Sequence, residues 1–253
     1  MTDNREQIPI FYFNKITIKD VMEAAKYVSE STSPDDCFKT EYQKLLCESW
    51  APFFCDIVNS CFEEGVFPSV FKISVIFPLL KNVKLDPNKL DSYRPVSNIT
   101  FLSKVIERII VVQLIEHFEK YQLIDPFQSA YRKHHSTETA LLATLNDILL
   151  HLDNGQQVLV LSLDLSAAFD TLSHFLILEI LTIYAKLSPC AVQLMKSYLT
   201  ERKQCVMING KRSSYRTPKT GVPQGHWSNF IFTISYSFIT RYVKDISETS
   251  SIC

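Results

Sequence analysis

The feature that most constrains the fold is a short apolar run at residues 158–163, V-L-V-L-S-L, which follows Asn154-Gly155 and ends at Asp164. An apolar run this short, coming after a turn signal, predicts a strand buried on both faces of a sheet. An ionised carboxylate at the end of such a strand loses solvation, so it requires hydrogen bonds, a basic side chain or a bound cation. Taken alone, Asp164 therefore has two interpretations: the N-cap of the next helix, or a ligand of a cation.

Helices are expected on both sides of this run. Thr17 and Asp20 form a capping-box pattern, so a helix should begin after Thr17 and end within residues 31–36. Further helices are predicted at residues 42–62, 102–121, 172–184 and 189–199, and after the N-cap Ser136. The stripe of the helix after Ser136 consists of Leu141, Leu145, Ile148 and Leu152. We expect this stripe, like that of residues 102–121, to face the core.

Two further signals indicate strands. Residues 75–80 form a short apolar run, whereas residues 84–94, which contain proline, predict a loop. Asn209-Gly210 between two extended segments is typical of a hairpin, because both central residues of its turn need positive φ. Helices combined in this way with a sheet predict an α+β fold, with the helices packed on one face of the sheet.

Composition favours an ordinary globular protein in a reducing environment. The 253 residues are 46% apolar and 21% charged. The seven cysteines show no C-x-x-C spacing, which predicts neither a zinc site nor a disulfide framework. No apolar run approaches the roughly 18 residues that span a membrane, and the first residues lack the apolar core of a secretory signal. We therefore expect a soluble, intracellular protein without membrane contact.

The formal net charge of −1 averages over segments of opposite sign. Residues 201–220, the basic stripe, contain Glu201 and six basic side chains: Arg202, Lys203, Lys211, Arg212, Arg216 and Lys219. Because counterion release from phosphates drives sequence-independent binding, this stripe could follow a nucleic-acid backbone. On charge alone, a solvated hairpin explains it equally well.

Three more segments contain groups suited to ligand binding. The turn G-V-P-Q-G at residues 221–225 lets the backbone approach a ligand closely, because glycine has no Cβ. S-Y-R-P at residues 92–95 and Q-S-A-Y-R-K-H-H-S-T at residues 128–137 offer basic side chains that could hold a triphosphate. Each segment taken alone is more typical of a surface loop. The histidines in and near them lack a third ligand at suitable spacing, so they predict no metal site.

In combination and in this order, these segments and L-D-L-S-A-A-F-D at residues 163–170 resemble the reverse transcriptase domain of LINE-type (non-LTR) retrotransposons. The resemblance covers residues 16–225, including G-V-F-P-S-V-F-K at residues 65–72 and K-S-Y-L-T-E-R-K-Q at residues 196–204. It implies the fingers and a partial palm of a right-hand polymerase, a ferredoxin-like sheet with packed helices and no thumb. The implied parts are a helical N-terminal extension at 1–70, fingers at 71–157, a partial palm at 158–225 and a divergent tail at 226–253.

The resemblance also implies a chemistry in which two Mg²⁺ ions, held by carboxylates, join nucleotides to a DNA primer on an RNA template. Asp164 would be a metal ligand, assisted by the carbonyl of Leu165, and Asp170 matches a second characteristic acid without an assigned role. Around the incoming nucleotide, the resemblance implies Arg132 and Lys133 at the triphosphate and Phe169 as the gate against a ribose 2′ hydroxyl. Gln224 and Gly225 would line the nucleotide and template site. Arg94 would support the fingers. In the basic stripe, Arg202, Lys203, Lys211 and Arg212 would contact nucleic acid.

The sequence departs from the family pattern after Gly225. The family continues with S-x-L-G-P-L-L-F and later with [FY]-A-D-D, whereas this chain continues with H-W-S-N-F-I-F, and no [FY]-A-D-D occurs in it. Two of three metal-binding carboxylates are therefore missing, which implies weak Mg²⁺ binding, no polymerase activity and a truncated chain without thumb or endonuclease. Three interpretations remain open: a polymerase domain completed from elsewhere, a non-catalytic nucleic-acid-binding remnant, and the product of a decayed element.

Overall fold

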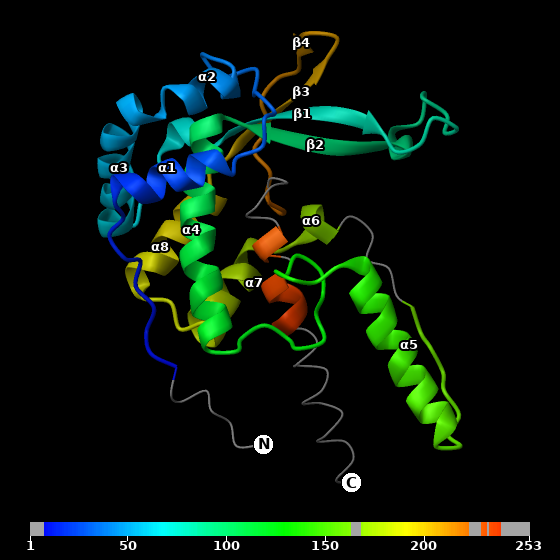
Figure 1. Ribbon diagram of the computed structural model, residues 1–253. Coiled ribbons are helices and arrows are strands. Elements are labelled where there is room, and N and C mark those ends of the chain that lie inside the picture. Colours follow the sequence, from blue (N-terminus) through cyan, green and yellow to red (C-terminus); the bar gives the residue numbers. More distant parts are fainter. Residues whose placement is uncertain (1–7, 163–167, 223–228, 232, 239–253) are drawn as a thin grey trace.

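Helices and a small mixed sheet make up the protein, as expected for a chain that combines both kinds of element (Figure 1). The computed structural model describes residues 8–162, 168–222, 229–231 and 233–238. The elements follow in the order α1 (Ile18–Lys26), α2 (Thr40–Leu45), α3 (Cys47–Glu64), η2 (Ser69–Phe71), β1 (Ile73–Leu80), η3 (Leu90–Ser92), β2 (Tyr93–Ile99), α4 (Phe101–Lys120), α5 (Thr137–Asp153), α6 (Ala168–Thr171), α7 (His174–Glu179), the π-helix η4 (Ile180–Tyr184), α8 (Pro189–Leu199), β3 (Lys203–Ile208) and β4 (Lys211–Arg212). Residues 229–231 and 233–238 are also helical.

The four strands of the sheet lie in the order β2-β1-β3-β4. Strand β1 pairs antiparallel with β2 and parallel with β3, and β3 pairs antiparallel with β4. Strand β1 confirms the strand expected at residues 75–80, but β2 was not expected, because Tyr93 and Arg94 were included in a predicted loop. Pro95 lies within β2, opposite Pro78 of β1. Proline is tolerated there because β2 is an edge strand, and an edge position cannot be read from local sequence.

Local capping signals determine several helix ends as expected. The backbone N–H of Thr17 donates to Oδ2 of Asp20 at 2.8 Å, which completes the capping box that starts α1. Helix α1 ends at Lys26, before the expected range. The helix expected at residues 42–62 is two helices, because the backbone at Leu46 (φ −87°, ψ 12°) separates α2 from α3. Helix α3 then ends at Gly65, which adopts the left-handed conformation that glycine favours.

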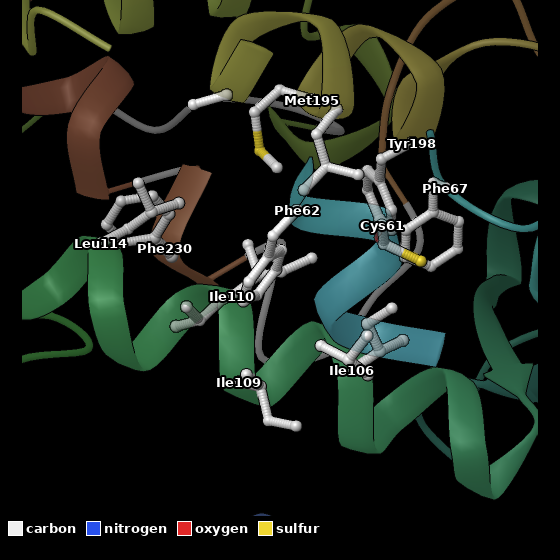
Figure 2. Packing of buried hydrophobic residues seen from close by; sticks show 14 of the residues in the cluster. Cys61, Phe62, Phe67, Ile106, Ile109, Ile110, Leu114, Met195, Tyr198 and Phe230 are labelled. Carbon is white, nitrogen blue, oxygen red and sulfur yellow. The ribbon is translucent and has the colours of Figure 1, made fainter. Parts of the chain in front are cut away.

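The hydrophobic core lies where α4 meets α3, α8 and the helical residues 229–231 and 233–238 (Figure 2). The inward face of α4 includes Ile106, Ile110 and Leu114, each at most 1% exposed. Phe230 packs edge-on against Phe118 of α4, with ring centroids 5.2 Å apart. The expectation that residues 102–121 form a core helix is therefore confirmed, and residues after the G-V-P-Q-G turn help to cover it.

Two expectations about the middle of the chain are wrong. Residues 158–162 form no strand and are exposed; Leu159 and Leu161 are 94% and 77% exposed. Ser136 caps α5 with a capping box as expected, yet α5 contains no buried residue, and Leu141 is 61% exposed. Figure 1 shows α5 projecting away from the other helices. Both runs are apolar in sequence, but no described element packs against them, and apolar periodicity cannot supply a neighbour.

The hairpin after α8 forms as expected. Asn209 and Gly210 have φ of 50° and 77°, the positive values that this type of turn requires. Helix α8 spans the predicted 189–199, with Pro189 in its first turn and Ser188 as its N-cap. Among the described residues, no helix is long and apolar enough to cross a membrane.

Candidate nucleotide and nucleic-acid site

Hydrogen bonds join the segment that follows L-D-L-S-A-A-F-D to the start of the G-V-P-Q-G turn. The hydroxyl of Thr220 donates to the backbone carbonyl of Asp170 at 3.0 Å, and the backbone N–H of Gly221 donates to the carbonyl of Leu172 at 2.9 Å. The Nε2 atom of His174, at the start of α7, lies 2.8 Å from the carbonyl oxygen of Gly221, so this nitrogen carries the proton and donates it. The end of the first motif and the start of the second, about fifty residues apart in sequence, therefore lie side by side.

Asp170 is the acidic residue of this region whose side chain the structure describes. It lies in α6 with an exposed side chain, and partial desolvation of the carboxyl raises its pKa. Phe169 is in the same helix, but its side chain lies outside the described part of the chain. Asp164 and Leu165, and likewise Gln224 and Gly225, are also outside it. Among the described residues, no group of three or more His, Cys, Asp or Glu side chains could hold a metal ion.

The segment containing Arg132 forms a loop organised by the guanidinium itself. Its Nη1 donates to the carbonyls of Asp125, Pro126 and Gln128 at 3.3–3.4 Å. The buried Gln128 accepts a 2.9 Å hydrogen bond at Oε1 from the hydroxyl of Ser237, which in turn accepts from the backbone N–H of Asp125 at 3.0 Å. The loop is thereby tied to the helical residues 233–238. Arg132 is half-buried, with Nη2 and Nε outside this network.

Three further basic side chains are exposed, and two of them are residues that the sequence singled out. Lys133 is exposed in the loop next to Arg132. Arg94 is exposed on β2, where it pairs in register with Leu79 of β1. Figure 1 shows β1 and β2 extending as a long hairpin beyond the helices. The turn of that hairpin also carries an exposed Lys84, which the sequence analysis did not single out.

The structure corrects the set of candidate nucleic-acid contacts in the basic stripe. Lys203 and Lys211 are exposed on β3 and β4. Arg212 is exposed, but its Nη1 forms a 2.7 Å ion pair with Oδ1 of Asp35, which partly neutralises it. Arg202 is only 3% exposed, so it cannot contact a nucleic-acid backbone. The pattern of charges could not predict the burial of Arg202, because it does not distinguish a basic side chain that points into the core from its exposed neighbours.

Arg202 instead belongs to a buried polar cluster with Tyr198 and Glu107. Its guanidinium lies over the ring of Tyr198, 4.6 Å from the centroid, and Nη1 donates to the carbonyl of Tyr198 at 3.3 Å. The hydroxyl of Tyr198 donates to Oε1 of Glu107 at 2.6 Å. Nε and Nη2 of Arg202 have no hydrogen-bond partner within the described ranges. Desolvation raises the pKa of Glu107 to about 7 and that of Tyr198 well above its usual value.

Comparison with known proteins gives a consistent answer. The family model described as "Reverse transcriptase (RNA-dependent DNA polymerase)" matches residues 83–249. The chain is 31% identical over 211 residues to the "RNA-directed DNA polymerase from mobile element jockey" of Drosophila funebris, covering 83% of this chain and 23% of that protein. It is 27% identical over 212 residues to the "Probable RNA-directed DNA polymerase from transposon BS" of Drosophila melanogaster, with the same coverage. The chain thus spans about a quarter of the length of these relatives.

Proposed function

Because the chain belongs to the reverse transcriptase (RNA-dependent DNA polymerase) family and its relatives come from non-LTR retrotransposons, we propose that it forms part of an RNA-directed DNA polymerase. Residues 1–70 act as a helical extension, residues 71–157 as fingers, residues 158–225 as the first part of the palm, and residues 226–253 as a divergent tail. The supporting observation is the hydrogen-bonded junction of Asp170, Leu172 and His174 with Thr220 and Gly221. This junction supports the proposal because it joins the end of L-D-L-S-A-A-F-D to the start of G-V-P-Q-G, the two motifs proposed to surround the incoming nucleotide.

The proposed nucleotide site lies at this junction. Arg132 and Lys133 hold the triphosphate, since the guanidinium of Arg132 is fixed by its loop and the ammonium of Lys133 is exposed. A preorganised guanidinium loses little conformational entropy when it binds a phosphate. Phe169, Gln224 and Gly225, which lie outside the described side chains, are the other residues assigned to this site by the proposal.

The proposed primer and template surface uses the exposed cations. Lys203 and Lys211 contact the phosphate backbone, Arg212 contributes less because it is paired with Asp35, and Arg94 extends the surface along β2. The contacts carry no sequence information, so binding is expected for any RNA–DNA hybrid and to weaken with salt.

Catalysis is not completed by these 253 residues. Mg²⁺ catalysis of nucleotidyl transfer requires carboxylates around two ions, and the sequence supplies Asp164 and Asp170 without an [FY]-A-D-D strand turn. The donor set present therefore does not fit a two-metal centre. We infer that the chain binds primer–template without extending it unless the other acids come from another segment; the alternative is a purely non-catalytic nucleic-acid-binding remnant.

Binding to a DNA primer annealed to an RNA template, titrated at several salt concentrations, tests the proposed surface. The double variant Lys203→Glu/Lys211→Glu should reduce the slope of log K against log salt by about two, because each lost phosphate contact contributes about one. The matched variant Lys19→Glu, at an exposed lysine of α1, should leave the slope unchanged. No measurable binding of the wild-type chain at low salt would refute the proposal.

A primer-extension assay separates the polymerase from its alternative. The chain alone should incorporate no nucleotide. Addition of a segment that carries the missing acids should restore incorporation that depends on Asp164 if the chain is part of a polymerase, and should restore nothing if it is a binding remnant. Incorporation by the purified chain alone, lost in Asp164→Asn, would show that the inference about missing acids is wrong.

A further inference from the structure

A groove separates two segments that the proposed function does not use. It lies between residues 65–72 and the length of α8, with Thr182 and Leu187 also in its lining, and its volume is about 720 Å³. The backbone N–H of Phe67 donates to the hydroxyl of Ser197 at 2.9 Å, and the rings of Phe67 and Tyr198 pack edge-on, 5.0 Å apart. Gly65 lies so close to α8 that an added Cβ would be 3.0 Å from a backbone carbonyl oxygen. These contacts fix the two walls of the groove relative to each other.

Lys72 is the charged group that the groove buries. Its side chain lines the groove, yet the residue is only 6% exposed. Its Nζ has one long contact, 3.4 Å to Oγ of Ser197, and no carboxylate of the described residues lies within salt-bridge distance. An ammonium has three N–H donors and loses solvation when buried, and this burial lowers the pKa of Lys72. The groove therefore contains a buried positive charge without an ion pair in the described part of the chain, and the charge of Glu201, which acts on Lys72 from a longer distance, only partly opposes the lowering of its pKa.

Ser197 strengthens the preference for an anion. Its hydroxyl oxygen accepts from both Phe67 and Lys72, so both lone pairs are used and its own proton remains available to donate. Lys196 adds a second ammonium at the exposed edge of the groove. The ammonium of Lys72 and the hydroxyl of Ser197 thus lie side by side as donors, which suits the oxygens of a single oxyanion, and Lys196 adds positive charge to the same groove.

The remaining lining indicates what kind of molecule carries that oxyanion. Val66, Leu187 and Val192 provide aliphatic walls, and no lining residue is aromatic, so bases of a nucleic acid would find no ring to stack on. Glu201 also lines the groove, so Lys72 and Lys196 together with Glu201 give the lining one net positive charge, which a single anion balances and a row of phosphates exceeds. One anion between apolar side chains fits better than a row of phosphates.

We propose that this groove binds a protein segment that presents one carboxylate between aliphatic side chains, with the carboxylate on Lys72 and Ser197. The aliphatic side chains of the segment cover Val66, Leu187 and Val192. This inference does not depend on the proposed polymerase function, because it uses none of the residues assigned to nucleotide or nucleic-acid binding.

Fluorescence polarisation with the labelled peptide Leu-Val-Asp-Val-Leu, blocked at both ends, tests the proposal. The same peptide with Asn in place of Asp differs only by the negative charge. The wild-type chain should bind the Asp peptide at least tenfold more tightly than the Asn peptide, a difference of about 1.4 kcal/mol. Lys72→Met should abolish that preference, whereas Lys84→Met, at an exposed lysine of the β1–β2 turn, should keep it.

A second variant covers the case in which Lys72→Met does not fold. Val192→Asp places a fixed carboxylate on the groove wall, so it should also abolish the preference for the Asp peptide while Lys72 stays in place. Equal affinity of the wild-type chain for both peptides, or no binding of either, would overturn the proposal. The proposal would also be overturned if a short RNA oligonucleotide displaced the Asp peptide from the wild-type chain and bound Lys72→Met more weakly than wild type.

Discussion

The buried carboxyl of Glu107 should make the stability of this protein depend on pH in an unusual direction. Burial raises the pKa of Glu107 from 4.5 to about 7, although Arg202 and the Tyr198 hydrogen bond act to lower it. Between these two values the folded state keeps a proton that the unfolded state has released. The free energy of unfolding therefore falls as pH rises through this window, the reverse of the behaviour of a salt-bridged acid.

The size of the effect follows from the two pKa values. One unit of difference corresponds to about 1.36 kcal/mol, so the rise from 4.5 to about 7 corresponds to a loss of about 3 kcal/mol, complete above pH 7. Glutamine has nearly the same volume, carries no charge and keeps an oxygen to accept from Tyr198. Glu107→Gln should therefore remove this pH-dependent loss without opening a cavity.

Urea denaturation of both proteins between pH 5 and 8 measures the effect. The stability of Glu107→Gln relative to wild type should increase by about 2–3 kcal/mol from pH 5 to pH 8. Taking the difference between the proteins cancels His117, whose pKa is lowered by burial and whose contribution has the opposite sign. Glu116→Gln, at an exposed position of the same helix, is the control. A difference that stays constant with pH, or one equally large in the control, would refute the reasoning.

Three smaller predictions concern backbone conformation, thiol reactivity and capping. Gly65→Ala should lower the free energy of unfolding by roughly 2 kcal/mol or more, because its φ of +67° and a 3.0 Å contact both oppose a Cβ. Gly155→Ala, at φ +71° but in open space, is the control and should lower it by about 1 kcal/mol. Denaturant titrations of the two variants measure the difference. Cys61 should react with a maleimide far more slowly than Cys37 at pH 8, because burial raises its pKa to about 11; labelling rates followed cysteine by cysteine by mass spectrometry compare the two, and equal rates would contradict the burial of Cys61. Ser136→Ala should remove about 1 kcal/mol of capping from α5 and speed amide exchange there with little change in the melting temperature; an equal loss of global stability would contradict the peripheral position of α5.

Short-range signals predicted the elements that depend on neighbours in sequence. The capping boxes at Thr17 and Ser136 and the turn at Asn209-Gly210 form as expected, and α8 has its predicted bounds. Each of these features is stabilised by bonds or φ values within a few residues. No distant part of the chain is needed to form them, and none overrides them.

In the candidate site, too, the sequence predicted one part and only the structure revealed the other. Motif order alone indicated the family, and the family model and relatives confirm it. Only the structure shows that His174, an unassigned histidine, joins the two motifs through the carbonyl of Gly221, and that Arg202 is buried against Tyr198 rather than exposed. Residue type and spacing could not reveal either contact, because both join parts of the chain whose relative positions follow from packing.

The sequence by itself determined the starts of α1, α5 and α8, the hairpin turn at Asn209-Gly210, and which family the chain resembles. Only the tertiary structure decided which apolar faces are covered: the apolar stripe of α4 is buried by α3 and α8, whereas those of α5 and residues 158–162 remain exposed. The physical reason is that periodicity arises within one element, while burial requires a second element, and that partner is chosen by long-range packing.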